Sequence, residues 1–255
     1  FAWVVLFDSF ILACGLIYFY LNNVKSPHIY SFKFSKHLAL SLLRDSWPLI
    51  IATMAMLIYK KIDQVMLQNI LNDSAQVGYY AAAVQITAGF SFIPVVIAQS
   101  IFPKLVSDYK NNFDVKRIFL IINSALIYLA IILYLIVFFY SNTIISVLYG
   151  EEYMKTRLIL VLHFVINIFI FAGVLVDRVI ISRNQQKTIT IRIVIGAVLN
   201  IVLNFMWIPE YGAIGASYST IISQFCASIL LLLLFKSTRE YFHWQILSLF
   251  YPALY

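Results

Sequence analysis

Apolar residues form seven long runs along this chain, and each run is separated from the next by a more polar connection. A helix needs about 20 predominantly apolar residues to cross the hydrocarbon core of a membrane, and the runs have about that length. The pattern therefore predicts an all-α integral membrane protein, a polytopic helical bundle with seven transmembrane helices. The predicted helices cover residues 1–21, 47–71, 77–101, 118–140, 158–181, 188–208 and 213–235.

Composition supports this fold class. Of the 255 residues, 62% are hydrophobic and only 11% are charged, whereas soluble domains average about 25% charged residues. Both cysteines, Cys14 and Cys226, lie inside predicted helices, where a thiol behaves as a small apolar group. We expect no disulfide framework, no metal site and no cofactor.

Basic residues are distributed unevenly over the connections. Alternate connections and the tail carry twelve Lys and Arg residues, while the other set carries only Lys155 and Arg157. By the positive-inside rule the basic set is cytoplasmic, so residue 1 is predicted outside and the C-terminus inside. The net charge of +7 then mostly faces anionic lipid headgroups, and we expect no nucleic-acid partner.

The connection 22–46 is the longest, and its basic and apolar residues alternate at near-helical spacing. We predict a cytoplasmic linker there, with a helix that lies on the inner membrane surface. This linker separates residues 1–21 from a C-terminal six-helix bundle at 47–235, and residues 236–255 are predicted as a cytoplasmic tail. Residue 1 is Phe within an apolar run, so we expect the chain to be the C-terminal part of a longer protein.

Charged residues interrupt the run at 47–71, SWPLIIATMAMLIYKKIDQVMLQNI. A helix there would be about 37 Å long against roughly 30 Å of hydrocarbon, which places Lys60 and Asp63 near the midplane. A charge at that depth costs about 2.5 to 3.5 kcal/mol. Lys60, Asp63 and Gln64 share one helical face, and Lys61 points about 100° away.

Two interpretations of these charges remain open. A Lys–Asp pair could simply offset its own burial cost and hold helices together. Alternatively, the surplus cation could stay in a water-filled cavity and attract an anionic substrate, with Asp63 as its counter-ion or as a proton-coupling group.

Other predicted helices also carry polar residues. Arg192, Asn200 and Asn204 form a stripe at helical spacing, which indicates either interhelical hydrogen bonding or the lining of a cavity. Asp177 and Arg178 lie near the predicted inner end of 158–181, where snorkelling to the interface is the alternative to a functional role.

A resemblance to a known family is carried by three segments: the run at 47–71, the following VGYYAAAVQITAGFSFIPVVIAQSIFPKL and the later NIVLNFMWIPEYGAIGASYSTIISQ. They resemble polysaccharide-exporting flippases of the multidrug/oligosaccharidyl-lipid/polysaccharide exporter superfamily, and within it the Wzx-type O-antigen repeat-unit transporters. The residues that carry the resemblance are those from Lys60 to Gln64, together with Pro94, Pro103, Asn200, Asn204, Pro209, Tyr211 and Gly212.

The resemblance implies twelve helices in two six-helix bundles around a central cationic cavity. Residues 1–21 would then be the last helix of the first bundle, and five further helices of the same protein would be partners of this chain. The implied activity is to flip an undecaprenyl-pyrophosphate-linked oligosaccharide, used for O-antigen, lipopolysaccharide or a related polysaccharide, from the inner to the outer leaflet of the bacterial inner membrane. Membrane lipids and the polysaccharide polymerase machinery would be further partners.

Such transport needs no covalent chemistry, so we expect no enzyme. The predicted substrate-binding residues are Lys60, Lys61, Gln64, Gln85, Arg178, Arg192, Asn200 and Asn204, and the predicted coupling or counter-ion residues are Asp63 and Asp177. One alternative is a cation-coupled exporter of drugs or small metabolites, in which Asp63 would bind the ion. A membrane glycosyl polymerase or ligase is a weaker alternative because the predicted outer connections are short.

Overall fold

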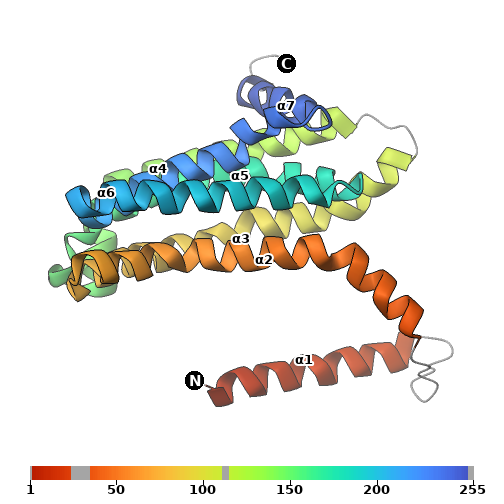
Figure 1. The fold of residues 1–255 in the computed structure, drawn as a ribbon, viewed down its shortest axis with the longest axis horizontal. Coiled ribbons are helices and arrows are strands. Elements are labelled where there is room, and N and C mark those ends of the chain that lie inside the picture. Colours follow the sequence, from red (N-terminus) through yellow and green to blue (C-terminus); the bar gives the residue numbers. More distant parts are fainter. Residues whose placement is uncertain (1, 24–34, 111–114, 252–255) are drawn as a thin grey trace. The chain divides into compact units, whose positions relative to one another are not determined.

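The structure, a computed structural model, describes residues 2–23, 35–110 and 115–251 (Figure 1). The described residues form helices and short turns, without any strand. The chain divides into two compact units, Phe1–Ser46 and Trp47–Tyr255. Of the predicted linker 22–46, residues 24–34 lie outside the described ranges, and the part from Lys36 onward is already helical.

The first unit contains α1 (Ala2–Asn23) and the beginning of α2 (Lys36–Leu71). The described side chains of α1 are apolar and exposed around most of the helix, including Phe7, Leu12 and Phe19. A helix that is hydrophobic on all sides needs lipid or other apolar helices around it, as in a membrane.

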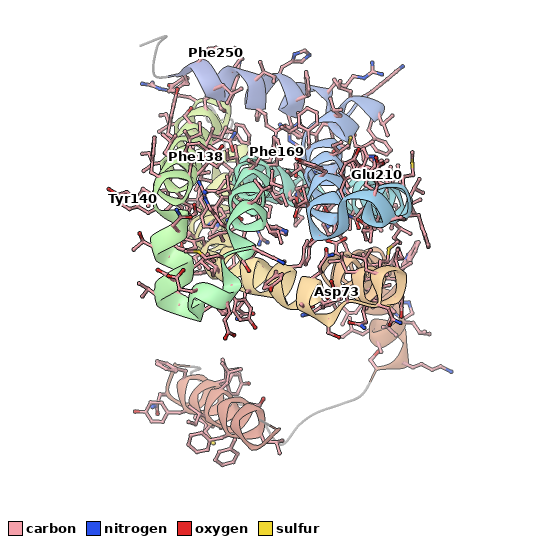
Figure 2. The ribbon with its side chains drawn as sticks, turned by 90° about the vertical axis from the view of Figure 1, so that its left-hand side faces the viewer. Asp73, Phe138, Tyr140, Phe169, Glu210 and Phe250 are labelled. Carbon is pink, nitrogen blue, oxygen red and sulfur yellow. The ribbon has the colours of Figure 1, made fainter. Side chains whose placement is uncertain are left out.

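The second unit is a bundle in which α5 is the most buried helix, packed against α3, α4 and α6. α2 joins this bundle through its second half, where Met66 and Leu67 are buried. Large apolar side chains elsewhere point outward, as Tyr140 of α4 does in Figure 2. The helices that follow α2 are α3 (Ser74–Lys110), α4 (Val115–Tyr149), α5 (Thr156–Ser182), α6 (Gln186–Ser228) and α7 (Arg239–Phe250), with short 3-10 helices η1 (Glu151–Tyr153) and η2 (Leu230–Leu234).

α6 reverses direction at Gly212 and forms two antiparallel arms (Figure 1). The backbone of Gly212 has φ 57° and ψ −133°, a conformation that is essentially restricted to glycine. Arg192 reaches the carbonyl oxygen of Ala227, and Asn200 reaches Thr220, so the arms stay in contact along their length. The predicted break between helices 188–208 and 213–235 is therefore confirmed.

Four segments of the described residues are long and apolar enough to span a membrane: Ser74–Ile101, Val115–Tyr149, Thr156–Ser182 and Gln186–Leu234. The last of these contains the reversal at Gly212, so it covers two of the predicted helices. The predicted helices 1–21 and 47–71 are helical as α1 and the second part of α2. A helical membrane protein is thus confirmed, while the count of seven spanning helices stays a prediction.

Two helices continue past the predicted apolar runs. α4 continues to Tyr149 rather than ending at 140, because Ser141 and Ile145 are buried and extend its packed face. α3 continues beyond 101 to Lys110, with Pro94 and Pro103 inside it. For α4, the packing of the buried Ser141 and Ile145, which the apolar run alone does not report, accounts for the longer helix.

α7 lies within the predicted tail and crosses α4, α5 and α6 rather than running along them (Figure 2). Tyr241 and Trp244 are buried in a core cluster with Phe119 of α4. Gln245 donates hydrogen bonds from its amide nitrogen to the carbonyl oxygens of Ala172 (2.9 Å) and Ser228 (3.3 Å). α7 is therefore a packed part of the bundle.

Candidate functional site

A buried polar site among the described residues of the second unit is centred on Asp63 of α2, which is only 4% exposed. Three side chains from other helices donate hydrogen bonds to its carboxyl group. The amide nitrogen of Asn204 lies 2.6 Å from Oδ1, while the hydroxyl groups of Tyr80 and Thr220 lie 2.6 Å and 2.9 Å from Oδ2. The carboxyl group thus connects α2 with α3 and with both arms of α6.

A second set of contacts fixes these donors. The Asn200 amide nitrogen donates to the Thr220 hydroxyl at 3.2 Å, and the Asn204 amide nitrogen also donates to Asn200 Oδ1 at 3.2 Å. On α2, the hydroxyl of Tyr59 lies 2.9 Å from that of Ser223. We call Asp63, Tyr80, Asn200, Asn204 and Thr220 the Asp63 network. Buried polar groups linked in this way specify one arrangement of the helices around them.

The Asp63 network lies far from the ends of its helices, so burying its polar groups there costs free energy. Asp63 lies eight residues before Leu71, the last residue of α2, so a helical rise places it about 12 Å from that end. Tyr80, Asn204 and Thr220 lie at similar distances from the turn after α2 and from Gly212. A carboxyl group at such a depth is expensive unless it is fully hydrogen-bonded, and polar groups placed there are usually functional.

His163 of α5 borders the network. Its ring meets that of Tyr80 edge to face, with the centroids 5.0 Å apart, and its Nε2 atom is buried without a hydrogen-bond partner. Further along α5, Asn167 Oδ1 accepts a hydrogen bond from Ser91 at 2.7 Å. The polar face of α5 therefore continues from the network toward the other end of the bundle.

The two predicted lysines are not brought into this network by any described contact. Lys60 lies on α2, but its side chain is outside the described part of the structure. Lys61 is exposed and pairs with no described carboxylate. The described partners of Asp63 are instead uncharged hydrogen-bond donors, so the Lys–Asp pair stays a hypothesis for Lys60 alone.

Asp177 and Arg192 form a second, separate site. Arg192 Nη1 lies 3.2 Å from Asp177 Oδ1, and Arg192 Nε donates to the Ala227 carbonyl oxygen at 2.9 Å. The arginine is 4% exposed and the aspartate side chain is 35% exposed. This pair ties α5 to both arms of α6, so Arg192 contacts a substrate phosphate only if it leaves Asp177.

We predict that Arg192→Ala lowers the stability of the bundle by about 1–3 kcal/mol, because it leaves a carboxylate and a carbonyl without their donor. Arg178→Ala is the matched control, since Arg178 is the neighbouring, half-buried cation on α5. The measurement is the fraction of monodisperse protein that remains after heating in detergent. An equal loss of stability in both variants would show that the ion pair between Arg192 and Asp177 contributes little to the stability of the bundle.

The other predicted ligands are more exposed. Gln64 and Arg178 are half-buried, and Gln85 is exposed on α3. Among the predicted site residues, the described contacts bring together Asp63, Asn200 and Asn204 in one place and Asp177 with Arg192 in another.

Sequence reasoning missed Tyr80 as a hydrogen-bond donor to Asp63, and it assigned Thr220 only to close helix packing. Nothing in the sequence marked Tyr80, a hydroxyl residue six positions into α3, as a hydrogen-bond donor to Asp63.

Comparison with known proteins finds relatives whose names refer to polysaccharide or glycan biosynthesis. Residues 2–109 match the family of polysaccharide biosynthesis proteins, and this region includes Asp63 and Tyr80. The chain is 26% identical over 152 residues to the probable low-salt glycan biosynthesis flippase of Haloferax volcanii, a match that covers 58% of this chain and 32% of that protein. The resemblance to polysaccharide flippases is confirmed.

A second relative is the capsular polysaccharide biosynthesis protein of Staphylococcus aureus, which is 26% identical over 137 residues, 52% of this chain and 34% of that protein. The chain therefore spans about a third of the length of these two curated relatives. No solved structure matches the chain. In a helical membrane protein, a hydrogen-bonded carboxyl group inside the bundle is a natural candidate for the functional centre.

Proposed function

We propose that the complete protein flips a lipid-linked oligosaccharide, carried on undecaprenyl pyrophosphate, from the inner to the outer leaflet of a bacterial inner membrane. The C-terminus is then cytoplasmic, and the transported unit serves O-antigen, lipopolysaccharide or a related polysaccharide. The observation that carries the proposal is the Asp63 network, a buried polar centre between helices of a flippase-type protein. The glycan and capsular polysaccharide roles in the relatives' names support the substrate class.

Asp63 is proposed as the coupling residue. Its carboxyl group is held by three neutral donors from α3 and α6, and the described residues place no cation against it. Uptake of a proton or a cation there would weaken some of those hydrogen bonds. Because the bonds connect α2 to the α6 hairpin, such an event would change how the two are held together, which is what alternating access requires.

The substrate's two phosphates need cationic partners in a low-dielectric bundle, and the proposed partners are Lys60, Lys61, Arg178 and Arg192. Gln64, Gln85, Asn200 and Asn204 would hydrogen-bond sugar hydroxyls. For Asn200 and Asn204 this requires that the network opens, since their amides are engaged with Asp63 and Thr220. Substrate binding and the uptake of a proton or a cation at Asp63 would then depend on each other.

A test uses the complete protein in liposomes that contain a fluorescent undecaprenyl-pyrophosphate oligosaccharide. A membrane-impermeant quencher bleaches only outer-leaflet label, so flipping appears as complete rather than half-maximal bleaching. We expect complete bleaching with the protein, half-maximal bleaching without it, and no effect on a labelled phosphatidylcholine. Half-maximal bleaching by correctly inserted protein would contradict the proposal, and export of a cationic dye instead would favour the small-molecule exporter.

A further inference from the structure

A pocket of about 450 Å³ opens at the end of the second unit where the turn after α2, the start of α5 and the reversal of α6 meet. By the predicted topology this end faces the outside. The volume falls within the usual range of about 300–1,000 Å³ for small-molecule sites. The pocket is separate from the Asp63 network and none of the predicted site residues lines it.

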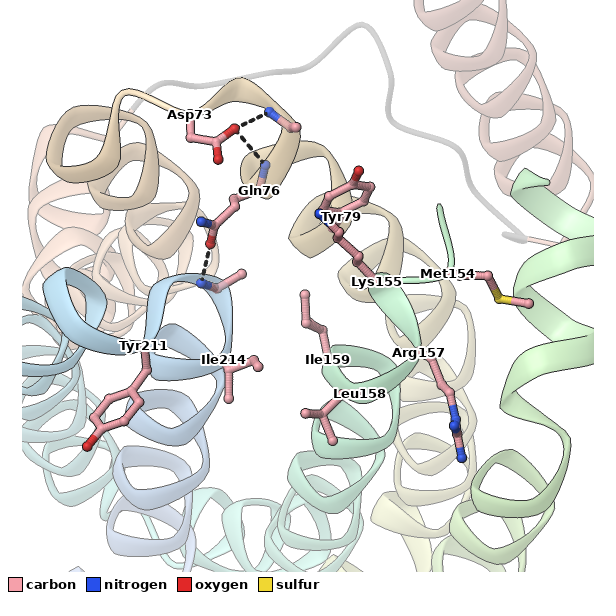
Figure 3. A pocket seen from close by; sticks show the side chains of 12 residues that line it. Asp73, Gln76, Tyr79, Met154, Lys155, Arg157, Leu158, Ile159, Tyr211 and Ile214 are labelled. Carbon is pink, nitrogen blue, oxygen red and sulfur yellow. Dashed lines mark hydrogen bonds between the residues drawn. The ribbon is translucent and has the colours of Figure 1, made fainter. Parts of the chain in front are cut away.

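Hydrogen bonds fix one wall of the pocket. The Oε1 atom of Gln76 accepts the backbone N–H of Ala213 at 3.0 Å and so joins α3 to the reversal of α6. Asp73 Oδ1 accepts the backbone N–H groups of Ala75 (2.9 Å) and Gln76 (3.3 Å), while its Oδ2 takes part in neither bond. Figure 3 shows these side chains above the open space, with Ile214 beside it.

The opposite wall carries an aromatic ring and a cation. The ring of Tyr79 is packed edge to face against Tyr153, with the centroids 5.7 Å apart. Lys155 extends to Tyr79, and its Nζ atom lies 6.0 Å from the centre of the ring (Figure 3). No carboxylate of the described residues forms an ion pair with Lys155.

Among the described residues that line the pocket, Lys155 is the one cation presented to a ligand. Arg157 also lines it, but its Nε donates to the hydroxyl of Ser141 at 3.3 Å, and Figure 3 shows the guanidinium turned away from the open space. Buried Ile159 and half-buried Ile214 give the pocket an apolar floor. A pyrophosphate, with at least two negative charges, would find only one partner here.

We propose that this pocket binds an acidic sugar residue of the transported glycan at the outer end of the bundle. The sugar carboxylate would pair with Lys155, its hydroxyl groups would donate to Asp73 Oδ2, and the apolar face of the ring would lie against Ile159 and Ile214. The inference rests on the proposed function, because it concerns the same glycan. It adds a second contact site, about 12 Å or more from Asp63 along the helices.

The test is direct binding of methyl β-glucuronide to the purified complete protein in detergent, followed by saturation-transfer NMR. Methyl β-glucoside, which lacks the carboxylate, and inorganic phosphate are the comparison ligands. We expect the glucuronide to bind at least about tenfold more tightly than the glucoside, because its carboxylate adds one charge-assisted hydrogen bond. It should also bind more tightly than phosphate, which lacks the sugar ring that contacts Ile159 and Ile214. Lys155→Ala should remove the preference over the glucoside. Lys187 is an exposed lysine of α6 remote from the pocket, so Lys187→Ala should leave the preference unchanged.

A variant that fills the pocket, Ile214→Trp, should abolish binding of both sugars. Equal affinity for glucuronide and glucoside, an unchanged preference in Lys155→Ala, or tighter binding of phosphate would each overturn the proposal. These results are independent of the liposome test. Flipping without glucuronide binding would reject the acidic-sugar site alone, whereas glucuronide binding without flipping would reject the proposed transport.

Discussion

Asp63→Asn is expected to leave the protein folded and to lower glycan export at least about tenfold. An asparagine keeps the shape of the side chain and one carbonyl acceptor, so most of the packing between α2, α3 and α6 should persist. It cannot carry a negative charge or take up a proton, which removes the proposed coupling step. The export measurement is surface polysaccharide in cells that lack their own exporter, at matched membrane levels of the complete protein.

Asp63→Ala is expected to affect stability as well. It removes the described acceptor of the Tyr80 hydroxyl, and one of two acceptors of the Asn204 amide and of the Thr220 hydroxyl, in a buried site. Each such group costs about 1–3 kcal/mol, and local relaxation limits the total to about 2–4 kcal/mol. Lipid-linked repeat units should accumulate inside cells that carry this variant.

The matched control for both variants is Ser124→Ala. Ser124 is also buried and donates to the Ser248 carbonyl oxygen at 2.7 Å, but it lies between α4 and α7, away from the network. We expect normal export in this control and a loss of about 1 kcal/mol. If Asp63→Asn exports normally, the network has a structural role only.

Gly212→Ala is expected to destabilise the second unit by about 2–4 kcal/mol. The backbone conformation of Gly212 excludes other residues at a cost of about 1–3 kcal/mol. A Cβ atom at this position would also lie 2.2 Å from Gln76 Oε1, so it would displace the side chain that accepts the Ala213 N–H. Loss of that hydrogen bond adds about 0.5–1.5 kcal/mol.

Gly78→Ala is the matched control for this prediction, because it is a glycine near the same end of the bundle. A Cβ atom there would meet only the Tyr153 hydroxyl, at 3.9 Å, which is an ordinary contact. Since alanine favours a helix, this variant should be as stable as the starting protein or more stable. Heating in detergent followed by size-exclusion chromatography compares the two. Equal stability of both variants would show that the reversal at Gly212 tolerates a side chain.

The sequence by itself determined the fold class and the positions of most helices. Apolar runs of about 20 residues with few charges have no other stable environment than a membrane, so length and composition were sufficient. The reversal of α6 was also predictable, since Pro209 and Gly212 interrupt two apolar runs. Three segments showed a resemblance to polysaccharide flippases, and the comparisons confirm that resemblance.

Only the tertiary structure decided which polar residues meet. Helical spacing placed Asp63 beside Lys60 on one face, but it could not show that Tyr80, Asn204 and Thr220 supply the hydrogen bonds to Asp63. Likewise, Arg192 and Asp177 were separate candidates until α5 and α6 brought them within 3.2 Å. Periodicity determines the face of its own helix on which a residue lies, whereas the residues that it contacts depend on how helices distant in the sequence pack together. For the same reason the pocket beside Lys155, built from three separate connections, had no signature in the sequence.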